Sequence, residues 1–100
     1  MPEIGQVALK VRSKNAGPFW VTVDIFCGSE AAYAQISQGL STERVADLFQ
    51  TDPATLKRFD MAELNVVKFS LPRPTVQGSI EDRDMHGAAW GPLLAELEIN

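Results

Sequence analysis

The stretch Phe19-Trp20-Val21-Thr22-Val23-Asp24-Ile25-Phe26-Cys27 decides the fold. Its odd-numbered positions are apolar, and β-branched and aromatic residues dominate it, so the pattern predicts a strand over residues 19–27 with one continuous apolar face. The other face carries Trp20, Thr22, Asp24 and Phe26. Residues 13–18 have turn chemistry. They separate this strand from an earlier one over residues 7–12, so the two strands are expected to pair as a hairpin.

Helix signals follow this hairpin. Ser29 can cap a helix that begins at Glu30, and Gly39 can close it in a left-handed turn. Ser41 or Thr42 caps a second helix, whose buried stripe is Val45, Leu48 and Phe49. Proline suits the first position of a helix, so Asp52-Pro53 predicts a short third helix, anchored by Leu56 and Phe59.

Two more strands are expected after the helices. Residues 60–71 read as one strand, although Leu64 and Val66 lie on one face and Val67, Phe69 and Leu71 on the other. This slip indicates a bulge or burial on both faces. Residues 93–99 form the closing strand, with Leu93, Ala95, Leu97 and Ile99 inward. The whole is predicted to be a single α+β domain over residues 1–100, a two-layer sandwich of a mainly antiparallel four-stranded sheet with helices on one face.

Composition narrows the function classes. The chain has 100 residues, 45% hydrophobic and 22% charged, which is typical of one globular domain. Its net charge of −4 disfavours nucleic acid and anionic membranes as partners. Cys27 is the single cysteine, so no internal disulfide can form. The first residues lack a signal-peptide pattern and no apolar run spans a bilayer, so we expect a cytoplasmic protein.

The polar stretch Arg12–Pro18 is the first candidate site. The guanidinium of Arg12 matches the geometry of carboxylate and phosphate groups, and Lys14 adds a second cation. Glycine lets main-chain N–H groups converge on an anion. The candidate ligand-binding residues are Arg12, Ser13, Lys14, Asn15 and Gly17. The alternative is a solvated hairpin loop with ordinary turn residues.

A second candidate segment, residues 81–87, contains the only histidine of the chain and three carboxylates. His86 could act as a general base, with Asp84 beside it. One histidine does not supply the ligands of a typical metal site, so we expect no metal and no cofactor. The alternative is a charged surface loop.

Two other patterns favour structural roles. Cys27 lies on the apolar face of its strand, so we expect a buried thiol. Residues 41–60 have the rhythm of a helix-turn-helix, which would need an exposed basic helix around residues 53–59. Balanced charges there disfavour this interpretation.

Several of these segments resemble a small uncharacterised family associated with AtuA-type acyclic terpene utilisation proteins, and the ferredoxin-like C-terminal domain of AtuA. The resemblance is carried in order by residues 12–18, 40–45, 67–74, 84–87 and 92–94. It implies a ferredoxin-like fold, organic acid or acyl-CoA catabolism, and action with an AtuA-type large chain. It supports Arg12, Ser13, Asn15 and Gly17 as site residues, and adds Arg73, Asp84, His86 and Gly87. Lys14-Asn15 stand where the related loop has Gly-Asp, so a general-base role for that aspartate does not transfer, since an amide is a poor base.

Three functions are therefore open. The first is a small subunit, homo-oligomeric or bound to an AtuA-type partner, that binds an anionic small molecule. The second is a free-standing lyase or hydratase that needs Asp84 or His86 near Arg12. The third is a helix-turn-helix module that binds DNA.

Overall fold

A computed structural model of the chain describes residues 2–17, 19–72 and 90–99. Its elements run in the order α1 (Ile4–Val7), β1 (Lys10–Asn15), β2 (Trp20–Phe26), α2 (Glu30–Gly39), α3 (Thr42–Leu48), β3 (Lys57–Met61), the 3-10 turn η1 (Ala62–Leu64), β4 (Val66–Pro72) and α4 (Trp90–Ala95). No helix among these residues is long and apolar enough to cross a membrane.

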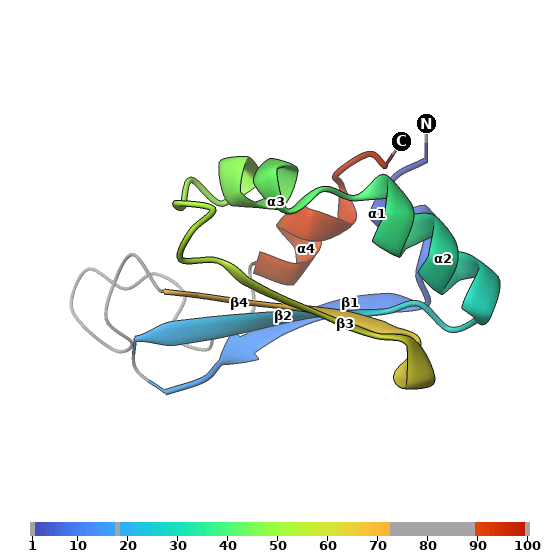
Figure 1. The fold of residues 1–100 in the computed structure, drawn as a ribbon, viewed down its shortest axis with the longest axis horizontal. Coiled ribbons are helices and arrows are strands. Elements are labelled where there is room, and N and C mark those ends of the chain that lie inside the picture. The colour runs from blue at the N-terminus through green and yellow to red at the C-terminus, as the bar shows by residue number, and fades with distance from the viewer. Residues whose placement is uncertain (1, 18, 73–89, 100) are drawn as a thin grey trace.

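The four strands form one antiparallel sheet in the order β1-β2-β4-β3. All four helices lie on the same face of this sheet (Figure 1). The predicted two-layer α+β sandwich is thereby confirmed. Its connections are two hairpins joined through α2 and α3, whereas a ferredoxin-like fold alternates β-α-β-β-α-β, so the correspondence lies in the layers.

The core lies between the sheet and the helices. The alternation of β2 buries Val21, Val23 and Ile25, and β4 buries Val67, Phe69 and Leu71 against them. Cys27 continues the apolar face of β2. The helices contribute further fully buried side chains, among them Ile36, Val45 and Leu94. The two central strands therefore carry most of the sheet's contribution to the core, and β1 and β3 are its edges.

The first two long helices agree with the sequence signals. Ser29 caps α2 by accepting a hydrogen bond from the Ala32 N–H at 3.1 Å, and Ser41 caps α3 by accepting from the Arg44 N–H at 3.2 Å. The left-handed turn predicted at Gly39 is wrong. The cap residue Leu40 is extended, with φ −113°, and a side chain from β3 fulfils the capping role described below.

The prediction of one strand over residues 60–71 is wrong, because this segment contains a turn. Residues 57–61 and 66–72 form the hairpin β3–β4, and Asn65 turns the chain in the left-handed region with φ 54°. The slip in the apolar pattern marked this turn. No glycine or proline stands there to signal it. Asp52-Pro53 likewise starts a single turn rather than a helix: the Asp52 side chain accepts from the Ala54 N–H, Leu56 is buried as expected, and Phe59 is 48% exposed.

The predicted closing strand over residues 93–99 is also wrong. Residues 90–95 are helical, so Leu94 is fully buried while Leu93 is 48% exposed. A short apolar run fits a helix or a strand equally well, and Pro92 is tolerated in the first helical turn. Only the tail extends: Glu98 forms an isolated bridge with Glu3, and the Ile99 N–H donates to the Pro2 carbonyl at 2.9 Å.

The first strand is displaced by three residues from the prediction over residues 7–12. Ile4–Val7 form a helical turn, and the strand runs over Lys10–Asn15. Leu9, which the predicted strand included, precedes β1 and is 73% exposed. The displacement places most of the predicted polar loop inside a strand.

Candidate functional site

Strand geometry divides the predicted loop site between two faces of the sheet. Successive side chains of a strand point to opposite sides. Arg12 and Lys14 are therefore exposed on the face without helices, whereas Ser13 and Asn15 lie half-buried on the helix side. The structure brings together the two cations but separates them from the hydroxyl and the amide. Pro18 lies outside the described residues.

Ser13 has a structural contact. Its hydroxyl accepts a hydrogen bond from the backbone N–H of Gly91 at 2.8 Å and so joins β1 to the start of α4. A Cβ added at Gly91 would lie 3.2 Å from both the Ser13 nitrogen and the Val11 oxygen, so glycine permits this close approach. Helix α4 thereby holds the strand from which Arg12 and Lys14 project.

Gly17 adopts a left-handed conformation, with φ 82°, and no atom lies within 4 Å of an added Cβ. The hairpin turn requires this conformation, which glycine adopts without strain. The close approach of a ligand is therefore not needed to explain glycine here.

The exposed cations line a small hollow. Its volume is about 140 Å³, and it is lined by Arg12, Ser13, Lys14, Asp24 and Phe26. A water molecule in the liquid takes up about 30 Å³. The hollow therefore matches one carboxylate or phosphate group with its nearest waters, and is small compared with the pockets of about 300 Å³ or more that enclose whole ligands.

The basic character extends across the whole outer face of the sheet, as the register shows. One cross-strand row is Lys14, Thr22, Ser70 and Lys57; the next is Arg12, Asp24, Lys68 and Phe59; the third is Lys10, Phe26, Val66 and Met61. We call these twelve residues the open face; two of them, Thr22 and Val66, are themselves buried, at 5% and 7% exposed, so the contact surface is formed by the other ten. It carries five cations against one carboxylate, and across the described ranges none of these cations forms an ion pair.

Two of these cations lie over aromatic rings. The ammonium of Lys10 is 5.0 Å from the ring centroid of Phe26, and that of Lys57 is 5.5 Å from the centroid of Trp20. The attraction of an ammonium to a ring face holds the lysines over the sheet. Trp20 and Phe26 lie on the outer face of β2, as the sequence predicted, and both are half-buried.

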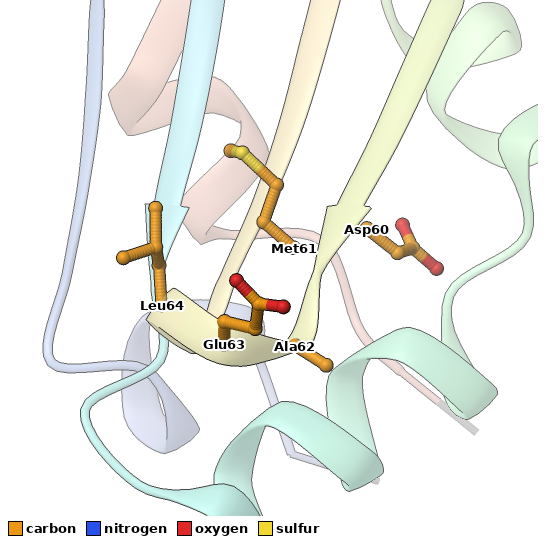
Figure 2. Close-up of a pocket in the computed structure, with 5 residues that line it drawn as sticks. All are labelled: Asp60, Met61, Ala62, Glu63 and Leu64. Carbon is orange, nitrogen blue, oxygen red and sulfur yellow. The ribbon is translucent and has the colours of Figure 1, made fainter.

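A larger hollow of about 460 Å³ lies at the turn between β3 and β4. Figure 2 shows that its lining, Asp60–Leu64, comes from one short stretch of chain. Its two carboxylates are those of Asp60 and Glu63, and Asp60 is engaged by Arg58. Leu64, also in the lining, is 67% exposed. This hollow lacks convergent polar groups from separate elements, so we do not treat it as a site.

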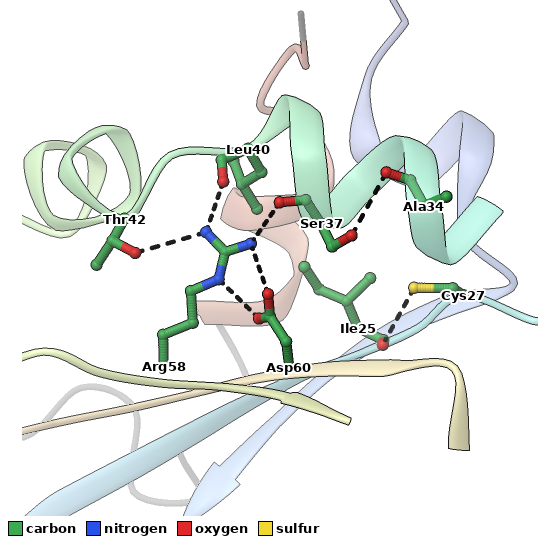
Figure 3. Close-up of polar contacts among 8 residues, drawn as sticks. All are labelled: Ile25, Cys27, Ala34, Ser37, Leu40, Thr42, Arg58 and Asp60. Atoms are coloured by element: carbon green, nitrogen blue, oxygen red, sulfur yellow. Dashed lines mark hydrogen bonds and ion pairs between the residues drawn. The ribbon is translucent and has the colours of Figure 1, made fainter. Parts of the chain in front are cut away.

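Arg58, on the helix side of β3, is a structural residue. Its guanidinium donates to both Asp60 carboxylate oxygens, at 2.8 and 3.3 Å, and to the carbonyls of Ser37 and Leu40 at the end of α2 (Figure 3). A longer contact of 3.5 Å reaches the Thr42 hydroxyl. All five N–H groups of an arginine are thus directed at partners, and Arg58 provides the cap that Gly39 does not.

Cys27 is 3% exposed, which confirms the prediction of a buried thiol. The Sγ donates to the Ile25 carbonyl at 3.8 Å (Figure 3). Burial raises the pKa of the Cys27 thiol, and the negative charge of Asp60 raises it further. A thiol that stays protonated is a poor nucleophile.

The remaining candidates are Arg73, Asp84, His86 and Gly87, which all lie outside the described residues. Within residues 2–17, 19–72 and 90–99, no three of His, Cys, Asp and Glu gather as a metal site would require. The helix-turn-helix interpretation fails on the fold, because it needs a helix around residues 53–59, and residues 57–59 lie in strand β3.

Fold and surface together define a small α+β domain whose helices cover one face of the sheet and whose other face is basic. Residues 4–98 match the family model described as a domain of unknown function, DUF4387, and the chain belongs to this family. No curated protein and no solved structure matches it.

Proposed function

We propose that the protein is a small subunit that binds an anionic small molecule through the β1–β2 hairpin and acts beside an AtuA-type metabolic chain. The pair Arg12 and Lys14 is the observation that supports binding of an anion. Both are exposed on one face, line one hollow, and form no ion pair with any described residue. The AtuA-type partner, and organic acid or acyl-CoA catabolism as the setting, rest on the resemblance of the sequence segments.

In this proposal Arg12 binds the anion through its planar guanidinium and Lys14 adds a point charge from two residues further along β1. Asp24 lines the same hollow and limits its net charge. Ser13 also lines the hollow, but its hydroxyl accepts from the Gly91 N–H and fixes β1 to α4. The size of the hollow means that the anionic group is bound there while the rest of the ligand lies outside.

An NMR titration with phosphate, succinate and coenzyme A tests the ligand. We expect amide shifts to concentrate at residues 12–14, 24 and 26, and Arg12→Gln to weaken the best ligand about 10- to 100-fold, the range of charged hydrogen bonds. Gln38→Glu on α2, which changes the net charge by the same amount, should leave the affinity unchanged. If Arg12→Gln and the parent protein bind all three anions equally, the ligand proposal fails.

Co-expression with an AtuA-type large chain tests the partner. We expect the two chains to elute together in size-exclusion chromatography. Separate elution at micromolar concentrations would overturn this part and leave the anion site untouched.

A further inference from the structure

The two layers of this protein differ in charge. Lys10, Arg12, Lys14, Lys57 and Lys68 lie on the open face with the single carboxylate Asp24. In or beside the helices, the described acidic residues are Glu3, Glu30, Glu43, Asp47, Asp52, Glu96 and Glu98, with Arg44 as a cation there. The sum of −4 therefore conceals a basic surface on an acidic molecule.

The edges of the sheet are poorly suited to pairing with another strand. Helix α4 packs against β1, where the Gly91 N–H binds the Ser13 hydroxyl. On the other edge, β3 points the charged residues Arg58 and Asp60 toward the helix layer, and inward charges of this kind oppose strand addition. A partner that contacts the sheet is therefore directed to its open face.

We infer that the open face is a docking surface for an extended acidic segment of a partner protein. The three cations of β1 stand at alternate residues, so their spacing is about 6.7 Å. An extended chain with Asp or Glu at alternate positions presents carboxylates at the same spacing. Phe59, 48% exposed on β3, offers an apolar contact at the opposite side of the face.

The area of the face matches a short segment. Its backbone spans about 14 Å across the strands and about 14 Å along them. With side chains this is a few hundred Å², below the about 800 Å² that each partner buries in a stable interface. The contact is therefore weak and depends on charge, so it weakens as salt is added.

Two other occupants fit less well. A second copy placed face to face would bring five cations against five, which is repulsive. Single-stranded nucleic acid needs free aromatic rings on which bases stack, but lysines lie over Phe26 and Trp20. Both occupants are outcomes of the experiment below.

The probe is a fluorescent peptide of alternating Glu and Thr, compared with its Gln-Thr counterpart and with oligothymidylate. We expect the full-length protein to bind the Glu peptide alone, with affinity falling at least about tenfold between roughly 50 and 300 mM salt. Arg12→Gln/Lys14→Gln should weaken binding about 3- to 30-fold and Lys57→Gln about 2- to 5-fold. The control Gln35→Glu/Gln38→Glu changes the net charge by the same amount as the double variant but lies on α2, and should bind like the parent.

This inference rests on the proposed function in part, because both use Arg12 and Lys14. Lys57 distinguishes the two proposals experimentally, because it lies on the opposite edge strand and does not line the small hollow. Weaker peptide binding in Lys57→Gln, with phosphate binding unchanged, supports the docking surface; unchanged peptide binding in this variant contradicts it. The inference is overturned if the Gln-Thr peptide or oligothymidylate binds as well as the Glu peptide. It is also overturned if the α2 control weakens binding as much as the β1 variant, or if sedimentation shows a dimer that Lys57→Gln dissociates. Each result leaves the small-anion titration standing.

Discussion

Replacing Arg58 with alanine is expected to destabilise the domain by about 3 kcal/mol, more than most surface changes. The side chain is 15% exposed and connects β3 to the end of α2. Its loss leaves the carbonyls of Ser37 and Leu40 without this charged donor. Each lost hydrogen bond, at the edge of the core, lowers the free energy of unfolding by about 1 to 1.5 kcal/mol. The ion pair adds about 0.5 kcal/mol, because Asp60 is 38% exposed and screened by water. The guanidinium also lies 5.6 Å from the Phe69 ring centroid, and that contact is lost.

Urea unfolding followed by circular dichroism measures this effect, with Asp60→Ala as the matched control. That variant removes the carboxylate but keeps the bonds to α2, so it should cost about 1 kcal/mol or less. Arg58→Lys keeps the charge but loses the fork, so we expect a cost between the two. In thermal unfolding, 3 kcal/mol corresponds to a lower Tm by roughly 12–24 °C in a domain of this size. An Arg58→Ala variant that loses less than about 1 kcal/mol, or no more than Asp60→Ala, would refute the capping role.

Two further outcomes test the packing. Gly91→Ala should destabilise the fold by about 1 to 3 kcal/mol and speed amide exchange in β1, because the new Cβ meets the β1 backbone at 3.2 Å. Gly17→Ala is the control: space is open there, so the variant should cost only the strain of φ 82°. Equal amide exchange rates of β1 in the two variants would contradict the close packing of α4 on β1. The raised pKa of Cys27 means that the folded state keeps its proton while the unfolded thiol loses it. Stability should therefore be full below about pH 8.5 and fall as the pH rises above it. Cys27→Ala should remove this part of the alkaline decline, and an unchanged pH profile would count against a buried thiol.

The sequence predicts the central part of the fold because its signals there are redundant. In β2 the alternation, the β-branched residues and the following Ser29 cap agree, and the structure has that strand and helix within one residue of the expected bounds. The errors fall where one local signal stood alone. Asn65 makes a turn without glycine or proline, and Leu93-Leu94-Ala95 suits a helix as well as a strand.

The candidate site could be predicted only in part for a related reason. Arg12 and Lys14 stand out in the sequence, but a strand displaced by three residues changes which side chains share a face. Lys57 and Lys68 lie far from Arg12 and Lys14 along the chain. Only the strand order β1-β2-β4-β3 brings all four side chains to the same face of the sheet. A net charge gives no information about such an arrangement, because it sums over both faces.

Among the described residues, the separation of the basic sheet face from the acidic helix layer gives the molecule a dipole directed from one layer to the other. In the field of a charged surface such a molecule rotates before it attaches, so its orientation on arrival is set at a distance. On an ion-exchange column we therefore expect retention on a cation exchanger at neutral pH despite a net charge of −4, with the sheet turned toward the resin.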